Sequence, residues 1–170
     1  ALSAISRAGV TNVQIIFNPF RLKPLDKVLP AAAAAGVAVF ARVPLASGLL
    51  SGRYTSQTSF AENDHRSYNR DGAAFDRGET FSGVDFETGL VAAEELTAAL
   101  PDGVSLPAAS LAWIASRPGV TTVIPGARTT AQAEANAAAG RIDPATLATF
   151  EAAVVDVYDR RLRADIHPQW

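Results

Sequence analysis

Cysteine is absent from the 170-residue chain, which excludes disulfides, thiolate metal sites and cysteine nucleophiles. A large charge of either sign is also absent: the formal net charge is only −2, so no basic surface for nucleic acid or for an anionic membrane is expected. No apolar run approaches the roughly 20 residues that span a bilayer, and residues 1–30 lack the layout of a signal peptide. We therefore expect a soluble, cytoplasmic protein without nucleic-acid or membrane partners.

Methionine is missing as well, even at position 1. The chain opens within a segment that has the composition of a helix, Ala1 to Gly9. Because a native start shows a methionine or a processed leader, we expect that residues precede Ala1 in the complete protein. With 48% apolar residues, the chain has enough hydrophobic side chains for a sizeable core. We interpret residues 1–170 as a single domain that is one portion of a longer protein.

Short apolar runs alternate with helical patterns along the chain. The runs are rich in β-branched residues, end at turn signals such as Asn18-Pro19 and Pro125-Gly126, and predict strands at residues 10–17, 37–43 and 120–124. Apolar residues at helical spacing predict helices at residues 25–35, 86–100, 106–116 and 143–158, and a further helix that Thr129 or Thr130 caps. Pro30 is expected to bend or divide the first of these helices.

This alternation predicts an α/β fold with about three parallel strands and flanking helices. Two architectures fit it, a doubly wound sheet and a piece of a (β/α)8 barrel, and both bind ligands at the carboxyl ends of the strands. The first strand-to-helix turn carries no G-x-G-x-x-G, which argues against a dinucleotide-binding doubly wound fold. Glycine-bearing turns follow the last two strands instead, as in the phosphate sites that barrels build after strands seven and eight. We therefore predict the C-terminal part of a (β/α)8 TIM barrel.

The stretch from Gly119 to Asn136 combines the third predicted strand, the Pro125-Gly126 turn and the start of a helix. Backbone N–H groups at the start of a helix have no partner within it, so such a junction attracts anions. Arg128 stands at this junction. The alternative interpretation is an ordinary turn with a surface arginine. A similar pattern of strand and glycines at residues 37–53 favours the anion site.

Residues 54–84 form a long polar segment without a periodic pattern. Connections longer than about 12 to 15 residues without regular structure are usually functional lids or disordered. We call these residues the clasp segment and expect it to fold over a bound ligand.

Four blocks of the sequence resemble the aldo-keto reductases. The blocks are Val13-Gln14 with Phe17-Asn18, the run from Ala41 to Arg53, Leu111-Ala112-Trp113-Ile114, and the run from Val123 to Arg128. They occur in order along essentially the whole chain, and the Pro-Leu-Ala-Ser-Gly-Leu-Leu and Ile-Pro-Gly-Ala-Arg runs are specific. The resemblance implies the C-terminal half of such a barrel. It also implies an NADP(H)-dependent oxidoreductase that reduces aldehydes or ketones to alcohols, with a small-molecule carbonyl compound as its substrate.

The resemblance further implies a set of cofactor contacts. Gln14 would hydrogen-bond the nicotinamide carboxamide, unless neighbouring backbone satisfies it as an ordinary buried glutamine. Arg42 stands where the family usually places an aromatic residue under the nicotinamide ring, so its guanidinium would stack there, or else meet the substrate or a carboxylate. The other implied contacts are with the pyrophosphate and the adenosine-phosphate part: Val43, Pro44, Leu45, Ala46, Ser47, Arg53 and Arg66 for the first, and Gly126, Arg128, Gln132 and Asn136 for the second.

No catalytic residue can be assigned in this chain. The aspartate, tyrosine, lysine and histidine that serve the family in catalysis lie on the first four strands of its barrel, and none of them maps onto these residues. The tyrosines and histidines that are present lie in other segments, and the adjacent pair Asp64-His65 does not make a metal site. We therefore expect no metal, and we expect the chain by itself to be inactive.

Three functions stay open at this point. The first is an NADPH-dependent carbonyl reductase, of which this chain supplies mainly the cofactor-binding half. The second is a non-catalytic nicotinamide-nucleotide-binding subunit like the potassium-channel β subunits, and the third is an inactive fragment. The preference for NADP(H) rests on Arg128, whose guanidinium suits a 2′-phosphate, and on the absence of Asp or Glu between Gly119 and Ala133. The sequence leaves the physiological substrate and the oligomeric state open.

Overall fold

Three parallel strands form the sheet of the computed structural model, which describes residues 1–169. They are β1 (Asn12–Ile16), β2 (Ala38–Arg42) and β3 (Thr122–Val123), and their order in the sheet is β1-β2-β3. Each new strand therefore lies beside the preceding one, and the sheet grows in one direction. In a doubly wound sheet the strand order reverses at the switch point. The predicted barrel-type α/β fold is confirmed, although the third strand is shorter than the predicted run of residues 120–124.

Helices account for much of the rest of the described chain. The α-helices are α1 (Leu2–Ile5), α2 (Val28–Ala35), α3 (His65–Tyr68), α4 (Phe86–Ala98), α5 (Leu106–Ala115), α6 (Thr130–Ala138), α7 (Pro144–Val157) and α8 (Arg163–Ile166). A π-helical turn, Tyr158–Leu162, joins α7 to α8. Side-chain caps explain where the four helices from α4 to α7 begin, because each cap accepts a hydrogen bond from the backbone N–H three residues further on: Asp85, Ser105, Thr129 and Asp143.

Helix α2 runs through Pro30 without a break, so the predicted bend or division at that residue is wrong. The helix begins at Val28, and Pro30 is its third residue. Backbone N–H groups in the first turn have no partner within the helix, so a proline there removes no hydrogen bond. The predicted helical segment does divide, but it divides earlier, between the short 3-10 turn Lys23–Leu25 and the start of α2.

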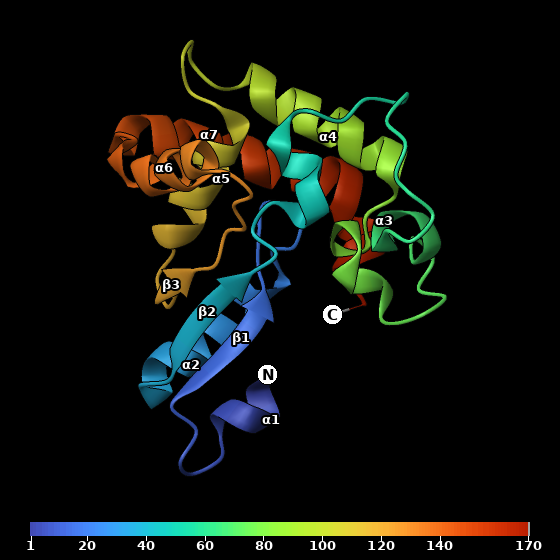
Figure 1. Cartoon of the computed structure of the whole chain (residues 1–170). Helices are drawn as coiled ribbons and strands as arrows, with labels where there is room; N and C mark the ends of the chain where they lie inside the picture. The colour runs from blue at the N-terminus through green and yellow to red at the C-terminus, as the bar shows by residue number, and fades with distance from the viewer. Residues whose placement is uncertain (170) are drawn as a thin grey trace.

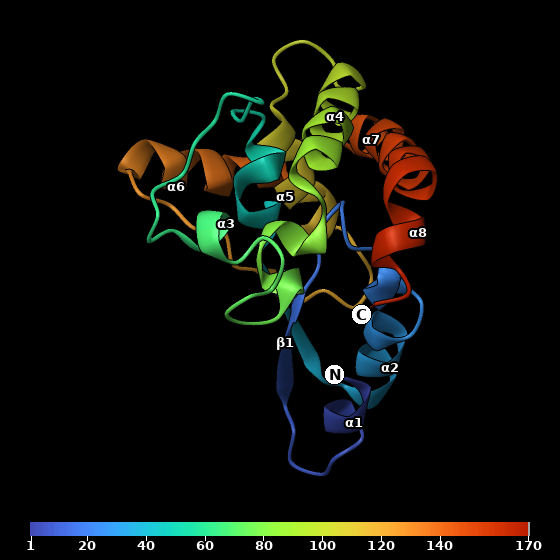
Figure 2. The ribbon, with the colours of Figure 1, turned by 90° about the vertical axis from the view of Figure 1, so that its right-hand side faces the viewer.

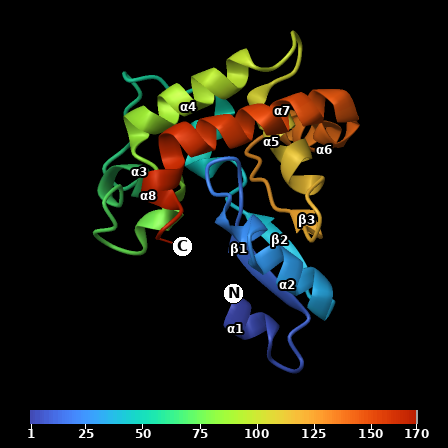
Figure 3. The same ribbon diagram turned by 180° about the vertical axis from the view of Figure 1, so that it is seen from behind.

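The two faces of the sheet differ in what covers them. Helix α2 lies against one face of the sheet (Figures 1 and 3). Val39 and Ala41 of β2 have no exposed surface and belong to the same core cluster as Ala32 of α2. Gln14 and Phe40 are neighbours on the opposite face, and Arg42 follows two residues further along β2. In Figure 1 that face turns toward the viewer with no helix in front of it. Parallel sheets are usually covered on both faces, so the uncovered face is the one that lines the interior of a barrel.

Helices α4, α5 and α7 contact one another and lie beyond the carboxyl ends of β1 and β2 (Figures 1 and 2). Trp113 of α5 packs against Phe17, which follows β1, with ring centroids 5.5 Å apart. The fully buried aromatic side chains of this region are Phe17, Phe20, Phe81, Trp113, Phe150 and Tyr158. The core therefore anchors the carboxyl ends of the strands and the loops that leave them.

Asn18, two residues after the end of β1, connects three of these loops and has no exposed surface. Its Oδ1 accepts a hydrogen bond from the backbone N–H of Phe20 at 2.9 Å. Its Nδ2 donates to the carbonyl of Val43 at 2.9 Å and to Ser82 Oγ at 2.8 Å. One buried amide thus ties the end of β1 to the loop after β2 and to the clasp segment.

We predict that Asn18→Ala destabilises the protein by about 2 to 4 kcal/mol, because it leaves buried polar groups of three loops without partners. Urea unfolding followed by circular dichroism measures the change. Asn12→Ala is the matched control, since the Asn12 side chain is exposed at the other end of β1 and bonds to Thr11 Oγ1, and its loss should cost less than about 0.5 kcal/mol. Equal losses in the two variants would contradict the role assigned to Asn18.

Candidate functional site

A cavity of about 680 Å³ lies at the carboxyl ends of β2 and β3. Its walls are the loop after β2, the first residues of α5, the loop between β3 and α6, and part of the clasp segment. Most of the residues predicted to contact a cofactor line it: Val43, Pro44, Leu45, Ser47, Arg53, Arg66, Gly126, Arg128, Gln132 and Asn136. Ala46 does not, because its side chain is buried in the core. The fold therefore brings together two blocks that lie far apart in the sequence.

Positive charge predominates in this cavity. Arg53, Arg66 and Arg128 line it, and none of its described lining residues is an aspartate or a glutamate. The starts of α5 and α6 also meet here, because Ser105 caps α5 and Arg128 lies just before the cap of α6. The partial positive charge at a helix start adds to the charge of the arginines. The cavity is therefore suited to a ligand with several negative charges.

The loop after β2 has a strained backbone. Val43, Ala46 and Ser47 have φ angles of 53°, 47° and 55°, which are left-handed values that residues other than glycine rarely adopt. Hydrogen bonds to the clasp segment hold this loop: Ser47 Oγ accepts from the N–H of Phe81 at 3.0 Å and donates to the carbonyl of Glu79 at 3.3 Å. Such strain costs about 1 to 3 kcal/mol per residue and persists where surrounding contacts enforce it, often at ligand sites.

Tyr54 packs over this loop at Gly48. A Cβ atom at Gly48 would lie 2.3 Å from the Tyr54 hydroxyl, so only glycine fits at this position. The Tyr54 hydroxyl donates to the carbonyl of Ser47 at 3.3 Å and accepts from Arg66 Nη1 at 2.5 Å. These contacts join the beginning of the clasp segment to the loop after β2 and bring Arg66 to the cavity.

Asp64 holds the Arg66 guanidinium in place. Arg66 Nε and Nη2 donate to its two carboxylate oxygens at 2.9 and 2.5 Å, and the guanidinium lies 4.7 Å from the centre of the Phe60 ring. The hydrogen bonds from Arg66 lower the pKa of Asp64 to about 2. Arg66 therefore brings its charge to the cavity in a fixed geometry, because Asp64 and Tyr54 occupy most of its donors.

Gln132 and Asn136 of α6 face the loop that precedes the helix. Gln132 Oε1 accepts from the backbone N–H of Arg128 at 2.7 Å, and Asn136 Nδ2 donates to the carbonyl of Gly126 at 3.2 Å. Thr129 Oγ1 accepts from the backbone N–H of Gln132 at 3.2 Å and caps the helix. Of the two predicted caps, Thr129 is the one that is used. These bonds fix the loop backbone while the Arg128 side chain stays exposed.

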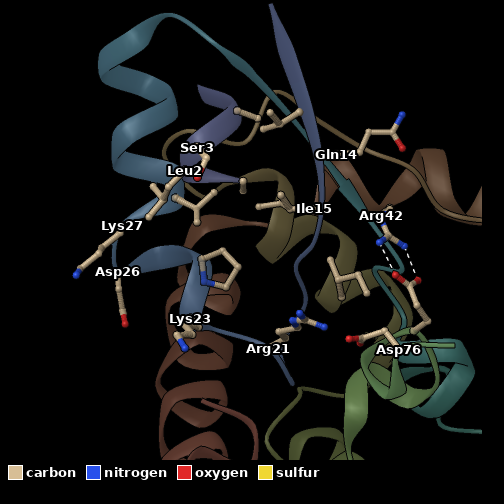
Figure 4. A pocket seen from close by; sticks show the side chains of 17 residues that line it. Leu2, Ser3, Gln14, Ile15, Arg21, Lys23, Asp26, Lys27, Arg42 and Asp76 are labelled. Atoms are coloured by element: carbon tan, nitrogen blue, oxygen red, sulfur yellow. Dashed lines mark hydrogen bonds and ion pairs between the residues drawn. The ribbon is translucent and has the colours of Figure 1, made fainter. Parts of the chain in front are cut away.

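Gln14 and Arg42 lie apart from this cavity, in a second one of about 1020 Å³ beside β1 (Figure 4). Arg42 Nη1 and Nη2 each donate to one carboxylate oxygen of Glu79 at 2.6 Å, and these hydrogen bonds lower the pKa of Glu79. Arg42 thus meets a carboxylate, one of the predicted alternatives. Gln14 is exposed on the uncovered face of the sheet. Arg21 and Asp76 point toward each other beside the Arg42–Glu79 pair (Figure 4).

Several residues that line the first cavity were not among the predicted cofactor contacts, for example Tyr54, His65 and Ser105. Ser105 carries a usable signal, because a serine before an apolar helical run is a typical N-cap. His65 carries none, because the clasp segment has no periodic pattern and only its folded form shows which side chains turn inward.

The chain matches the sequence profile of the Aldo/keto reductase family over residues 4–154. It belongs to this family. The glycerol dehydrogenase AKR11B4 from Gluconobacter oxydans is 24% identical, with a TM-score of 0.71 over 94% of this chain and 45% of that chain. The aldo-keto reductase AKR11C1 from Bacillus halodurans is 19% identical, with a TM-score of 0.65 over 97% of this chain and 49% of its own in the apo form. In its holo form the TM-score is 0.61, over 89% and 45% of the two chains.

This aldo/keto reductase chain thus spans about half the length of the solved structures that it matches. No curated protein matches it by sequence. Identities below 25% support the common fold alone, whereas the family match assigns the chain to a family of oxidoreductases. Within residues 1–169 no helix has the length and apolar character needed to cross a membrane, and no three metal-ligating side chains gather in one place.

Acid should loosen the clasp segment through Asp64. Folding lowers the pKa of this carboxyl to about 2, so its pair with Arg66 contributes stability that is fully present above about pH 4 and is lost as the pH falls through about 2. The protection factors of the amides in residues 54–84, which correct for the slower intrinsic exchange in acid, should fall as the pH is lowered from 5 to 2.

Asp64→Asn is the control for this effect, because asparagine also caps α3 but carries no charge. The variant should exchange faster at pH 5 and change less as the pH falls. Identical pH profiles in the two proteins would show that the Asp64–Arg66 pair does not hold the segment.

Proposed function

We propose that this aldo/keto reductase chain supplies the NADP(H)-binding half of a cytoplasmic enzyme that reduces small aldehydes or ketones to alcohols. The observation that carries the proposal is the cavity at the carboxyl ends of β2 and β3, where three arginines and two helix starts converge and none of the lining residues among residues 1–169 is acidic. NADPH carries a pyrophosphate and a 2′-phosphate, and these groups match the charge of the cavity.

The phosphates of the cofactor would divide between the two walls of the cavity. The strained loop of residues 43–47, with Arg53 and Arg66, would hold the pyrophosphate, since its backbone is fixed before a ligand arrives. Arg128 would bind the 2′-phosphate with its exposed guanidinium beside the start of α6. Gln132 and Asn136 would keep the loop of residues 126–129 in the required conformation.

Gln14 and Arg42 suit the nicotinamide end because both belong to the uncovered face of the sheet. The exposed amide of Gln14 would bond the carboxamide of the ring. The guanidinium of Arg42 and the carboxylate of Glu79 are joined by two parallel hydrogen bonds, which makes a flat surface below the ring. When bound, NADPH supplies the hydride for carbonyl reduction.

Arg128→Ala tests the proposal, because the loss of a charge-assisted contact worth about 1.5 to 3 kcal/mol should weaken NADPH binding roughly ten- to a hundredfold. NADH binding should barely change, since NADH has no 2′-phosphate. Fluorescence titrations of both cofactors on both proteins measure these affinities.

Arg141→Ala is the matched control for this substitution, because Arg141 is exposed and does not line the cavity. It should leave the binding of both cofactors unchanged. If Arg128→Ala weakens NADPH and NADH equally, Arg128 supports the fold and does not read the phosphate.

We also expect the 170-residue chain to turn over no carbonyl compound. Its described sheet has three strands, whereas a barrel of this type closes with eight, and the family's catalytic tyrosine, lysine and histidine do not map onto it. NADPH oxidation in the presence of an aromatic aldehyde provides the measurement. Turnover by the purified chain that disappears on heating would contradict this expectation.

A further inference from the structure

His65 lines the cavity of the arginines, although it belongs to the aperiodic clasp segment. It is the first residue of the short helix α3, and its side chain is half-buried. A neutral imidazole has one donor and one acceptor nitrogen, and its second partner decides which nitrogen carries the proton. The hydrogen bond at Nδ1 therefore determines whether the other nitrogen, Nε2, is a donor or an acceptor.

Two buried side chains, Asn69 and Thr80, form a series of hydrogen bonds that ends at His65 Nδ1. Asn69 Oδ1 accepts from the backbone N–H groups of Ala74 and Phe75 at 2.9 and 3.0 Å, so its Nδ2 is the donor that meets Thr80 Oγ1 at 3.1 Å. Asn69 has no exposed surface, and Thr80 is 1% exposed. Thr80 Oγ1 in turn lies 3.1 Å from His65 Nδ1.

The direction of this chain sets the tautomer of His65. Thr80 Oγ1 accepts from Asn69 Nδ2, and of its two side-chain partners within residues 1–169 only His65 Nδ1 can accept the buried hydroxyl proton. Nδ1 is then the acceptor, and the ring proton is on Nε2. Burying the polar side chains of Asn69 and Thr80 is costly unless they are bonded. Their hydrogen bonds fix the ring of His65, which is one of the residues that line the cavity.

The charges around His65 leave this donor available to a ligand. The two neighbouring carboxylates already bind arginines, Asp64 through Arg66 and Glu79 through Arg42. Within residues 1–169, no other side chain hydrogen-bonds to the His65 ring. The cavity lining contains no further acidic residue in the part of the chain that the structure describes. An anion that enters the cavity is therefore the acceptor that suits this donor.

We propose that His65 is a phosphate ligand, whose Nε2–H donates to a phosphate oxygen of the molecule bound in this cavity. The ligand class, a compound with linked phosphates, follows from the three arginines and the helix starts, whereas its identity as NADPH rests on the proposed function. Neither the family profile nor the resemblance assigns a role to this histidine.

The pyrophosphate is the part of NADPH that His65 would contact. Thr80, its anchor, follows Glu79, whose carbonyl accepts from Ser47 Oγ in the loop after β2. His65 is therefore linked to that loop through Thr80 and Glu79. Because its anchors belong to the clasp segment, the contact also holds this segment over the ligand.

Imidazole NMR tests this inference directly, because the chain contains only two histidines. His167 bonds to Asp26 and Tyr158 and does not line the cavity, so it serves as an internal reference. Long-range nitrogen–proton spectra should show the His65 ring proton on Nε2. The His65 resonances should shift when inorganic pyrophosphate is added, and again in a separate titration with NADPH, while those of His167 stay in place.

Two variants distinguish the effect of the N–H donor from the effect of the aromatic ring. His65→Phe keeps a ring beside Phe75 but removes the N–H, and it should weaken the binding of pyrophosphate and of NADPH about tenfold. His65→Gln restores an amide donor and should recover most of the affinity. Hydrogen exchange in residues 54–84 should slow on NADPH addition in the wild type and in His65→Gln, and less in His65→Phe.

The outcomes distinguish this proposal from the proposed function. If pyrophosphate shifts His65 but NADPH does not bind, the phosphate ligand stands and the NADP(H) function fails. If NADPH binds while His65 neither shifts nor changes the affinity on substitution, the function stands and His65 is not a ligand. A ring proton on Nδ1, or no response of His65 to either probe, overturns the proposal.

Discussion

The hydrogen bonds of Asn18 are the constraint on which the rest of the site depends. Three chain segments meet at this buried amide, and it bonds to each of them. Two of its partners, Val43 and Ser82, have left-handed φ angles of 53° and 60°. A strained backbone survives only where other contacts enforce it. The bonds of Asn18 therefore let the loop after β2 and the clasp segment keep the conformations that form the cavity.

The arginines of the site fall into two groups that act differently. Arg42 and Arg66 are each bonded to a carboxylate, so their positions are fixed. Arg53 and Arg128 are exposed at the cavity, and no lining residue among residues 1–169 compensates them. Uncompensated positive charge at one place disfavours the folded state by repulsion, and a bound anion relieves that repulsion. The paired arginines are held in place by their carboxylates, and the exposed ones leave positive charge at the cavity that an anionic ligand would neutralise.

The uncovered face of the sheet separates this chain from a self-contained α/β domain. Helix α2 covers one face, and within residues 1–169 no α-helix stands in front of the other face in Figure 1. Gln14 and Phe40 are partners across β1 and β2, and Arg42 follows two residues after Phe40. Much of the hydrophobic core lies beyond the carboxyl ends of the strands, where α4, α5 and α7 pack together. This arrangement supports the loops that line the cavity at the carboxyl ends of β2 and β3. It also places Gln14 and Arg42 where the remainder of a barrel would enclose them.

The sequence by itself determined the features that depend on a few adjacent residues. The β-branched runs marked all three strands, and Thr129 was among the predicted caps, because a cap and its N–H partner lie three residues apart. The blocks that resemble aldo-keto reductases placed the residues of two loops at one cavity, since both loops follow strands of the same sheet. The position of Pro30 in α2 was not predictable, because it depends on where tertiary packing starts the helix.

Only the tertiary structure decided which distant residues meet. The pairing of Arg42 with Glu79 and the anchoring of His65 on Thr80 depend on how the clasp segment returns to the core. That segment has no period of 2 or 3.6 residues, so its sequence does not show which side chains turn inward. Its path is set by contacts across long sequence separations, such as the bond from Asn18 to Ser82. Local patterns specify elements, whereas the chemistry of this cavity comes from contacts that form only when the whole chain has folded.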